Sequence, residues 1–360
     1  MSGNDLLEGL REKIDKIDVQ FLELLNDRSR IVQQIGEIKK QENASFYAPA
    51  REQEIYERLV RLNPGPFPND AVRSVFREII SASLCMESPI KVAYLGPPAT
   101  FTHLACTHRF GRSVSDFPVH SIKAVFDEVE RGRADFGVVP IENSTEGVVS
   151  HTLDLFVESP LKIFGEILLE ISHHLLSQNE KMEMIQRIYS HPHAIAQCKN
   201  FLETHLAGVP ITEVSSTAQA AQIAQSDPTA GAIASELAAK LYNLVVVKKR
   251  IEDNIYNCTR FLIISQKSPE KSGEDKTSLM CSIKDKAGAL CEMLSPFAAH
   301  KINLTKIESR PSKKKVWEYL FYIDLAGHIE EEGVRLALEA LKQQAVFFKV
   351  LGSYPKAQVL

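Results

Sequence analysis

LLEGLREKIDKIDVQFLELLNDRSRIVQQIGEIKK, residues 6–40, is the stretch that decides the fold of the first part of the chain. Its apolar residues recur at gaps that alternate between three and four, which predicts one long helix over residues 4–40, packed against another helix. This apolar seam consists of Leu7, Leu10, Ile14, Ile17, Phe21, Leu24, Ile31, Ile35 and Ile38. Arg28 also takes a seam position, and a buried guanidinium needs an anion beside it.

Arg28 and Lys39 are predicted to share one face of this helix. Eleven residues separate them, roughly 16 Å along the axis, so the two cations could hold a small dianion between them. Arg11 lies near the same seam, but roughly 25 Å from Arg28 and roughly 42 Å from Lys39. If all three serve one site, Arg11 comes from a second copy of the chain, and we expect an obligate dimer. The alternative is that Arg28 is a snorkelling arginine or part of a structural salt bridge.

Composition bounds the remaining possibilities. The chain has 360 residues, 44% of them apolar, which predicts two or three domains. A net charge of −4 does not indicate nucleic-acid binding. The sequence shows neither a run of 18 apolar residues, which would indicate a membrane span, nor a signal peptide, which would indicate export. The six cysteines form no CxxC pair, which favours reduced thiols in the cytoplasm and neither a disulfide frame nor a metal site. No cofactor is expected.

Two further helices are predicted in the first domain, residues 1–89. One spans residues 49–63 with Arg51, Ile55, Leu59 and Leu62 on one face, so Arg51 is expected to point to the core, beside Glu52. The other begins near Asp70 and carries Ser83 and Glu87, four residues apart and therefore neighbours. Three helices of this length bury too little apolar surface to form a stable core of their own, which again favours a dimer.

These residues resemble the all-helical chorismate mutase family. The match consists of Leu10-Arg11-Glu12-Lys13-Ile14, Arg28, Lys39, Arg51-Glu52, and Ser83 with Glu87. The resemblance implies rearrangement of chorismate to prephenate, with Arg28, Arg51 and the partner's Arg11 clamping the two carboxylates. Lys39 and the group at position 87 would stabilise the negative charge that develops on the ether oxygen.

Two positions depart from the enteric enzymes of this family, which carry glutamine where Glu87 stands and aspartate where Ala48 stands. An ionised Glu87 would repel the developing oxyanion, so we expect Glu87 to be protonated and mutase activity to decline as pH rises. The Glu87→Gln substitution should flatten that profile. Ala48 is left out of the predicted site.

Strands and helices alternate over residues 91–266, which predicts an α/β domain of two lobes with a cleft where strand ends meet. Polar turns gather at the presumed strand ends. Each one alone is more often a helix cap, but together they indicate a cleft lined by hydroxyl and amide groups for an acidic small molecule. These turns are Thr100 with Thr102, Asn143-Ser144-Thr145, Ser190-His191-Pro192, Ser215-Ser216-Thr217 and Asn257-Cys258-Thr259-Arg260-Phe261.

This domain resembles prephenate dehydratase along its whole length, through GPPATFTHLA, GVVPIENSTEG, YSHPHAIAQC, STAQAA and NCTRF; the family carries glycine where this chain has Ala99. The resemblance implies loss of CO2 and hydroxide from prephenate to give phenylpyruvate. It makes Thr259 the essential hydroxyl, which would donate a hydrogen bond or relay a proton, with Glu142 and His191 as alternative acids. The predicted prephenate site is Thr100, Glu142, Asn143, Ser144, Thr145, Ser190 and Gln197, with Arg260 for a substrate carboxylate.

Residues 266–276 are polar and predict a linker, and residues 277–360 follow a β-α-β-β-α-β order, which is ferredoxin-like. This third domain resembles the ACT regulatory module. The matching motifs, Gly288-Ala289-Leu290 and Glu308-Ser309-Arg310-Pro311, imply a phenylalanine site at a subunit boundary and feedback inhibition. The alternative for this domain is an inert dimerisation module.

Two rival functions remain for the whole chain. One is a non-catalytic amino-acid sensor, since two-lobed α/β and ACT domains both occur in binding proteins. It leaves Arg11, Arg28 and Lys39 unexplained. The other couples a mutase to a prephenate dehydrogenase, which needs a strand-GxGxxG-helix that the sequence lacks. The sequence leaves open whether dimers pair into tetramers.

Overall fold

The computed structural model describes residues 3–42, 47–284, 286–311 and 319–357. Its contacts divide the chain into two units, of which the first comprises residues 1–90 with 110–115, and the second the remainder. Among the described residues, no helix is both long and apolar enough to cross a membrane. All six cysteines are free thiols.

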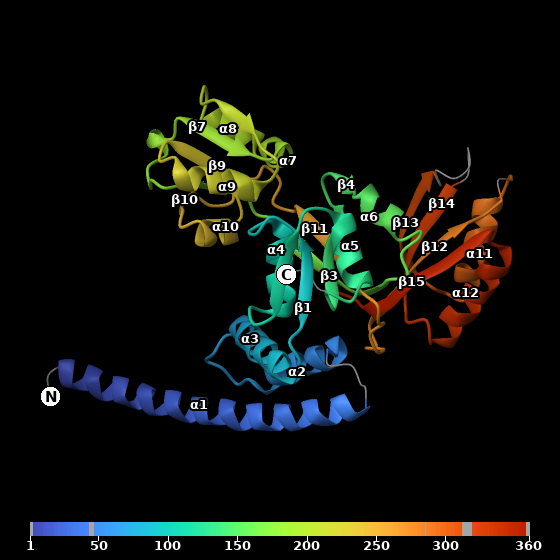
Figure 1. Cartoon of the computed structure of the whole chain (residues 1–360), viewed down its shortest axis with the longest axis horizontal. Coiled ribbons are helices and arrows are strands. Elements are labelled where there is room, and N and C mark those ends of the chain that lie inside the picture. Colours follow the sequence, from blue (N-terminus) through green and yellow to red (C-terminus); the bar gives the residue numbers. More distant parts are fainter. Residues whose placement is uncertain (1–2, 43–46, 285, 312–318, 358–360) are drawn as a thin grey trace. The chain divides into compact units, whose positions relative to one another are not determined.

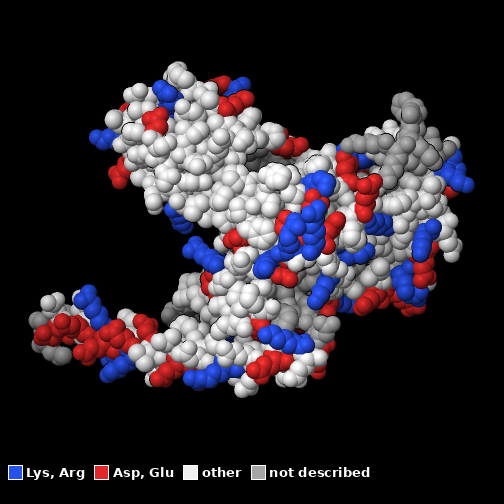
Figure 2. All heavy atoms as spheres, in the orientation of Figure 1, with Lys and Arg blue, Asp and Glu red and all other residues white. Residues whose placement is uncertain are grey.

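Unit 1 consists of three helices, α1 (Gly3–Glu42), α2 (Pro49–Leu62) and α3 (Asn69–Glu87) (Figure 1). The predicted long helix is confirmed. Within the chain, however, α1 packs on α3 through a different stripe, centred on Val32 and Gly36. The predicted seam stays exposed, with Ile14 56% and Leu24 66% accessible. Figure 2 accordingly shows uncharged atoms between charges of both signs along this helix.

Unit 2 begins with two lobes, each built on its own sheet, as predicted. The first sheet has the order β2-β1-β3-β11-β5, with β4 paired to β3, and the second has the order β10-β6-β9-β7-β8. In the first, β3 pairs parallel with β1 and antiparallel with β11; in the second, β7 pairs parallel with β8 and β9. Strands β5 and β6 follow each other along the chain but belong to different sheets.

The elements of these lobes have the following bounds: β1 (Lys91–Leu95), α4 (Phe101–Phe110), β2 (Ser115–Val119), α5 (Ile122–Glu130), β3 (Phe136–Asn143), β4 (Gly147–Val148), α6 (Ser150–Leu155), β5 (Lys162–Glu170), β6 (His174–Ser177), η1 (Met182–Met184), β7 (Arg187–Ser190), α7 (Pro192–Gln197), α8 (Lys199–His205), β8 (Ile211–Glu213), α9 (Thr217–Ser226), β9 (Ala230–Ala234), α10 (Glu236–Leu241), β10 (Val245–Lys248) and β11 (Cys258–Ser265). Ala99, in the turn before α4, has φ +69°, so it adopts the left-handed conformation that a glycine takes without steric penalty.

The third sheet, with order β13-β14-β12-β15, is antiparallel throughout. Its elements are β12 (Asp275–Ser282), α11 (Ala289–Ala299), β13 (Leu304–Pro311), β14 (Tyr319–Ala326), α12 (Glu332–Gln344) and β15 (Phe347–Pro355). The predicted β-α-β-β-α-β order is confirmed; the predicted start of the fourth element at Trp317 lies outside the described residues. Apolar residues of α11 and α12 form one core with this sheet.

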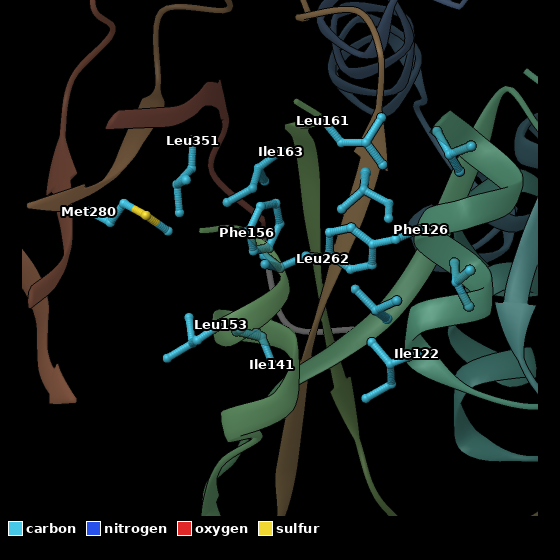
Figure 3. Packing of buried hydrophobic residues seen from close by; sticks show 14 of the residues in the cluster. Ile122, Phe126, Ile141, Leu153, Phe156, Leu161, Ile163, Leu262, Met280 and Leu351 are labelled. Atoms are coloured by element: carbon cyan, nitrogen blue, oxygen red, sulfur yellow. The ribbon is translucent and has the colours of Figure 1, made fainter. Parts of the chain in front are cut away.

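One apolar core continues from the first lobe into the third sheet. Figure 3 shows Met280 of β12 and Leu351 of β15 directed toward Phe156, Ile163 and Leu262. Strand β15 also contacts β5. The ferredoxin-like domain is therefore packed against the sheet that carries β3 and β11, and the two share buried surface within unit 2.

Candidate active sites

The first site forms where α1 meets α3. A Cβ built on Gly36 would lie 3.2 Å from Glu87 Cγ, so glycine at this position allows the two helices to approach closely. Lys39, one turn further along α1, places Nζ 2.9 Å from Glu87 Oε2. The side chain of Glu87 is only 7% exposed, so without substrate the Lys39 ammonium is its nearby counter-charge.

Arg28 belongs to the same site. Its guanidinium donates a hydrogen bond to Ser83 Oγ, which in turn donates to Ile79 O at 2.7 Å. Burial lowers the pKa of Arg28, and the negative charge of Glu87 acts in the opposite direction. The structure thus brings together four of the residues predicted for this site: Arg28, Lys39, Ser83 and Glu87.

Arg51 and Arg11 lie apart from this cluster among the described residues of unit 1. Arg51 is exposed and pairs with Glu54 at 2.8 Å, so the prediction that it points to the core is wrong. Helix α2 instead buries the stripe that contains Glu52 and Tyr56, whose hydroxyl donates to Glu52 Oε1 at 2.5 Å. Arg11 is exposed on α1, as is the apolar seam around it.

The second site forms at the ends of β3 and β11. Asn143 Nδ2 donates to Thr259 Oγ1 at 2.8 Å and to Asn257 Oδ1 at 2.9 Å. Asn143 Oδ1 accepts from the backbone N–H groups of Thr145 and Glu146, which fixes the orientation of its amide. Since Asn143 donates to Thr259 Oγ1, the Thr259 hydroxyl keeps its own proton available for a ligand.

A chain of polar groups continues from Asn257 into the second lobe. Asn257 Nδ2 donates to Gln197 Oε1 at 2.8 Å, and Gln197 Nε2 donates to Glu146 Oε1 at 3.3 Å. Gln197 Oε1 also lies 2.8 Å from His173 Nε2, so His173 donates from this nitrogen. Burial lowers the pKa of His173, which favours its neutral form.

His173 and Glu146 were not predicted for this site, and Asn257 was expected to line the cleft but not to bind prephenate. Asn257 and Glu146 stand inside the motifs NCTRF and GVVPIENSTEG, so adjacency to Thr259 and Asn143 was a signal for them. His173 gave none, because it lies 24 residues from its partner Gln197 and on the connection between β5 and β6.

Several residues predicted for the second site form side-chain hydrogen bonds with backbone atoms. Thr100 donates to Leu95 O at 3.2 Å, and its Oγ1 accepts from His103 N at 3.3 Å. Ser190 is fully buried and donates to Ile233 O at 2.7 Å. Ser144 Oγ accepts from Cys258 N, and His191 Nδ1 accepts from His193 N at the start of α7.

Glu142 and Arg260 point away from Thr259. Adjacent residues of a strand face opposite sides of a sheet, so the face opposite Asn143 and Thr259 carries their neighbours. Glu142 Oε2 lies 2.7 Å from Lys306 Nζ. The Arg260 guanidinium donates to Glu166, Asp324 and Tyr354, on the side of the sheet away from Thr259.

In the third domain, Gly288 has φ +81° and precedes α11, where Ala289 is buried and Leu290 exposed. Along β13, Glu308 and Arg310 are half-buried, whereas Ser309 and Pro311 are exposed. Arg310 Nε lies 3.4 Å from Asp154 Oδ1 on α6 of the first lobe. The strand with the second motif therefore contacts the neighbouring domain through alternate residues.

Comparison with known proteins finds three family matches in order along the chain. The chorismate mutase type II model matches residues 10–88, the prephenate dehydratase model residues 92–269, and the ACT domain model residues 277–343. A bifunctional chorismate mutase/prephenate dehydratase of Aquifex aeolicus is 52% identical, over 98% of this chain and 98% of its own. The corresponding protein of Pseudomonas aeruginosa is 46% identical, over 99% and 100%. The prephenate dehydratase of Arthrobacter aurescens, solved in complex with L-Phe, superposes with a TM-score of 0.70 at 35% identity, covering 74% of this chain and 90% of that one.

Proposed function

Because the chain belongs to the bifunctional chorismate mutase/prephenate dehydratase family, we propose that it carries out two consecutive steps of phenylalanine biosynthesis. The first converts chorismate to prephenate, and the second converts prephenate to phenylpyruvate with loss of CO2 and water. The observation that carries this proposal is 52% identity across 98% of the chain with a relative of that name. The six free thiols support a reducing, cytoplasmic setting.

For the mutase step, we propose that Arg28 and Lys39 provide fixed positive charge to a substrate with two carboxylates. Holding chorismate in the conformation that reacts lowers the barrier by orientation, without a nucleophile or a cofactor. The Lys39 ammonium would turn from Glu87 toward the ether oxygen as negative charge develops there. Ser83 keeps the Arg28 guanidinium in place.

We propose that this site needs a second copy of the chain. A row of large apolar side chains on α1 stays exposed, including Leu10 at 49% and Phe21 at 46%, and such a continuous apolar surface favours association. An antiparallel partner helix would also bring the partner's Arg11 toward Arg28, which the length of α1 prevents within one chain. Arg51 and Glu52 stay proposed chorismate ligands in that assembly.

For the dehydratase step, we propose that Thr259 donates a hydrogen bond to the ring hydroxyl of prephenate as the carbon–oxygen bond breaks. The electron pair of the breaking carbon–carboxylate bond completes the aromatic ring as CO2 leaves, and the departing hydroxide takes up a proton from solvent, relayed through Thr259, to become water. Asn143 supports this role, since its amide occupies a lone pair of Thr259 Oγ1 and orients the hydroxyl proton outward. Thr145 and Gln197 complete the proposed polar lining.

For regulation, we propose that L-phenylalanine binds the ACT domain at Gly288, Ala289 and Leu290 and at Glu308, Ser309, Arg310 and Pro311, and inhibits the dehydratase. The Arthrobacter aurescens relative, whose structure contains L-Phe, supports this expectation. Phenylalanine inhibits only if it binds more tightly to a less active conformation.

One experiment tests the two reactions, their regulation and the dimer together. Loss of chorismate is followed by ultraviolet absorbance, appearance of phenylpyruvate is followed after it, and both are repeated against phenylalanine concentration while the mass in solution is measured. We expect both reactions, inhibition of the second, and at least a dimer. Phenylalanine binding without either activity would instead favour the amino-acid sensor.

A further inference from the structure

The side of the first sheet that faces away from Thr259 carries a pair of opposite charges. Glu142 of β3 and Arg260 of β11 are partners in the strand register, directly next to the pair Asn143 and Thr259. Strand alternation therefore puts the proposed reaction groups on one face and the two charges on the other. Any movement of Glu142 or Arg260 along its strand is shared by the residue beside it.

The ACT domain presents the complementary pair. Lys306 of β13 and Asp324 of β14 are likewise partners in their strand register. Lys306 Nζ lies 2.7 Å from Glu142 Oε2, and Arg260 NH1 lies 2.6 Å from Asp324 Oδ2. We call these four residues the interdomain quartet. Positive and negative charges alternate around the quartet. If the third sheet shifted along the first sheet, residues of like charge would approach each other.

Three members of the quartet lie in a region with little solvent. The side chains of Lys306, Arg260 and Asp324 are 16%, 11% and 11% exposed, whereas that of Glu142 is 36% exposed. Burial by itself would lower the pKa of Arg260, but Tyr354, Asp324 and Glu166 raise it. A cavity of about 20 Å³, lined in part by Arg260, Lys306 and Asp324, has room for about one water molecule. The charge of Arg260, Asp324 or Lys306, left without its partner here, would be poorly compensated by solvent.

We propose that the interdomain quartet positions Asn143 and Thr259 for dehydration and transmits the state of the ACT domain to them. Lys306 is two residues from Glu308 on the same strand, so a ligand that moves this strand also moves the contact of Lys306 with Glu142. This inference rests on the proposed function. Its four residues are positioning residues, since none of them lies on the Thr259 face of the sheet.

The test compares wild type with Lys306→Met and Lys306→Arg in the full-length chain. Loss of the charge should lower the dehydratase kcat between about tenfold and a hundredfold, with KM nearly unchanged, because misplacement of reacting groups affects turnover more than binding. It should also reduce inhibition by phenylalanine while phenylalanine still binds. Lys306→Arg keeps the charge and should retain most of both properties.

A matched control shows whether the quartet positions Asn143 and Thr259 or only attaches the ACT domain to the first lobe. Asp154→Asn removes another ion pair of β13, that with Arg310, but Asp154 lies on α6 and not on a strand that carries Asn143 or Thr259. We expect its kcat to stay within about twofold of wild type. A second variant, Asp324→Asn, removes the other acid of the quartet and should resemble Lys306→Met.

The outcomes are distinct. If wild type makes phenylpyruvate and Lys306→Met keeps its kcat and its phenylalanine response, the quartet does not position the site. Equal losses in Lys306→Met and Asp154→Asn would show that the interface only attaches the domains, which also contradicts the proposal. If wild type makes no phenylpyruvate, the proposed function fails and the inference fails with it. Mutase activity, measured in each sample, reports that unit 1 is intact.

Discussion

The two candidate sites use opposite kinds of chemistry. The site on α1 and α3 consists of charges, with Arg28 and Lys39 set against Glu87, and its apolar surroundings stay open in a single chain. The site at β3 and β11 centres on neutral amides and a hydroxyl, joined with His173 and Glu146 into one network inside a single chain. The first reaction needs fixed positive charge beside the ether oxygen, where negative charge develops, whereas the second is driven by aromatisation and needs an oriented proton donor at the leaving hydroxyl.

The largest expected effect is loss of mutase activity when the Lys39 charge is removed. Lys39→Met should lower mutase kcat/KM by about 10²–10³-fold, because the group that stabilises the developing oxyanion is lost. The dehydratase should be unchanged. Lys40→Met, at the exposed neighbouring position, is the control. Equal losses in both variants, or none in Lys39→Met, would contradict the proposed role.

The next largest effect is loss of dehydratase activity, with the mutase unchanged, when the Thr259 hydroxyl is removed. Thr259→Ala should lower dehydratase kcat by about 10²-fold, the lower range for loss of a proton donor, and leave the mutase unchanged. Thr259→Ser keeps the hydroxyl beside Asn143 and should stay within about tenfold of wild type. Phenylpyruvate formation at a near-normal rate in Thr259→Ala would refute the assignment.

A smaller effect tests whether only the charged site is shared between chains. Arg11→Ala and Arg28→Ala should each have little mutase activity. When the two are co-expressed in equal amounts, random pairing makes half the dimers mixed, each with one complete site of two, so about a quarter of wild-type activity should return. Failure to recover activity in isolated mixed dimers would place each mutase site within one chain. Dehydratase activity should be normal in all samples.

The smallest effect concerns Glu87. Glu87→Gln should raise mutase kcat by only a few-fold, because the amide has no negative charge to oppose the one on the ether oxygen and forms no ion pair with Lys39. Steady-state rates of the two proteins decide the matter, and a kcat that falls in Glu87→Gln would contradict the expectation.

Patterns along the chain predicted the elements well, because spacing alone decides them. The three-and-four gaps predicted α1, and alternation of strand and helix predicted two lobes and the ferredoxin-like order. Spacing could not show which stripe of a helix its own chain covers. For this reason Arg51 was assigned to the core in place of Glu52, and the seam of α1 proved to be exposed.

The prediction of the second site was less complete for two physical reasons. Motif matching treated Glu142 with Asn143, and Thr259 with Arg260, as single groups, although neighbours on a strand face opposite sides. That error was avoidable from the sequence. The link from Asn257 through Gln197 to His173 was not, since it depends on how two lobes distant in sequence fold back on each other.

Because the proposed dimer forms through the open apolar row on α1, we expect the two activities to respond differently to temperature. Association through apolar surface weakens on cooling, whereas a network of hydrogen bonds within one chain does not depend on it in the same way. In the cold, subunits would separate first, and the protein would continue to consume prephenate while making less of it. Temperature would then set the balance between the two halves of the enzyme without any effector.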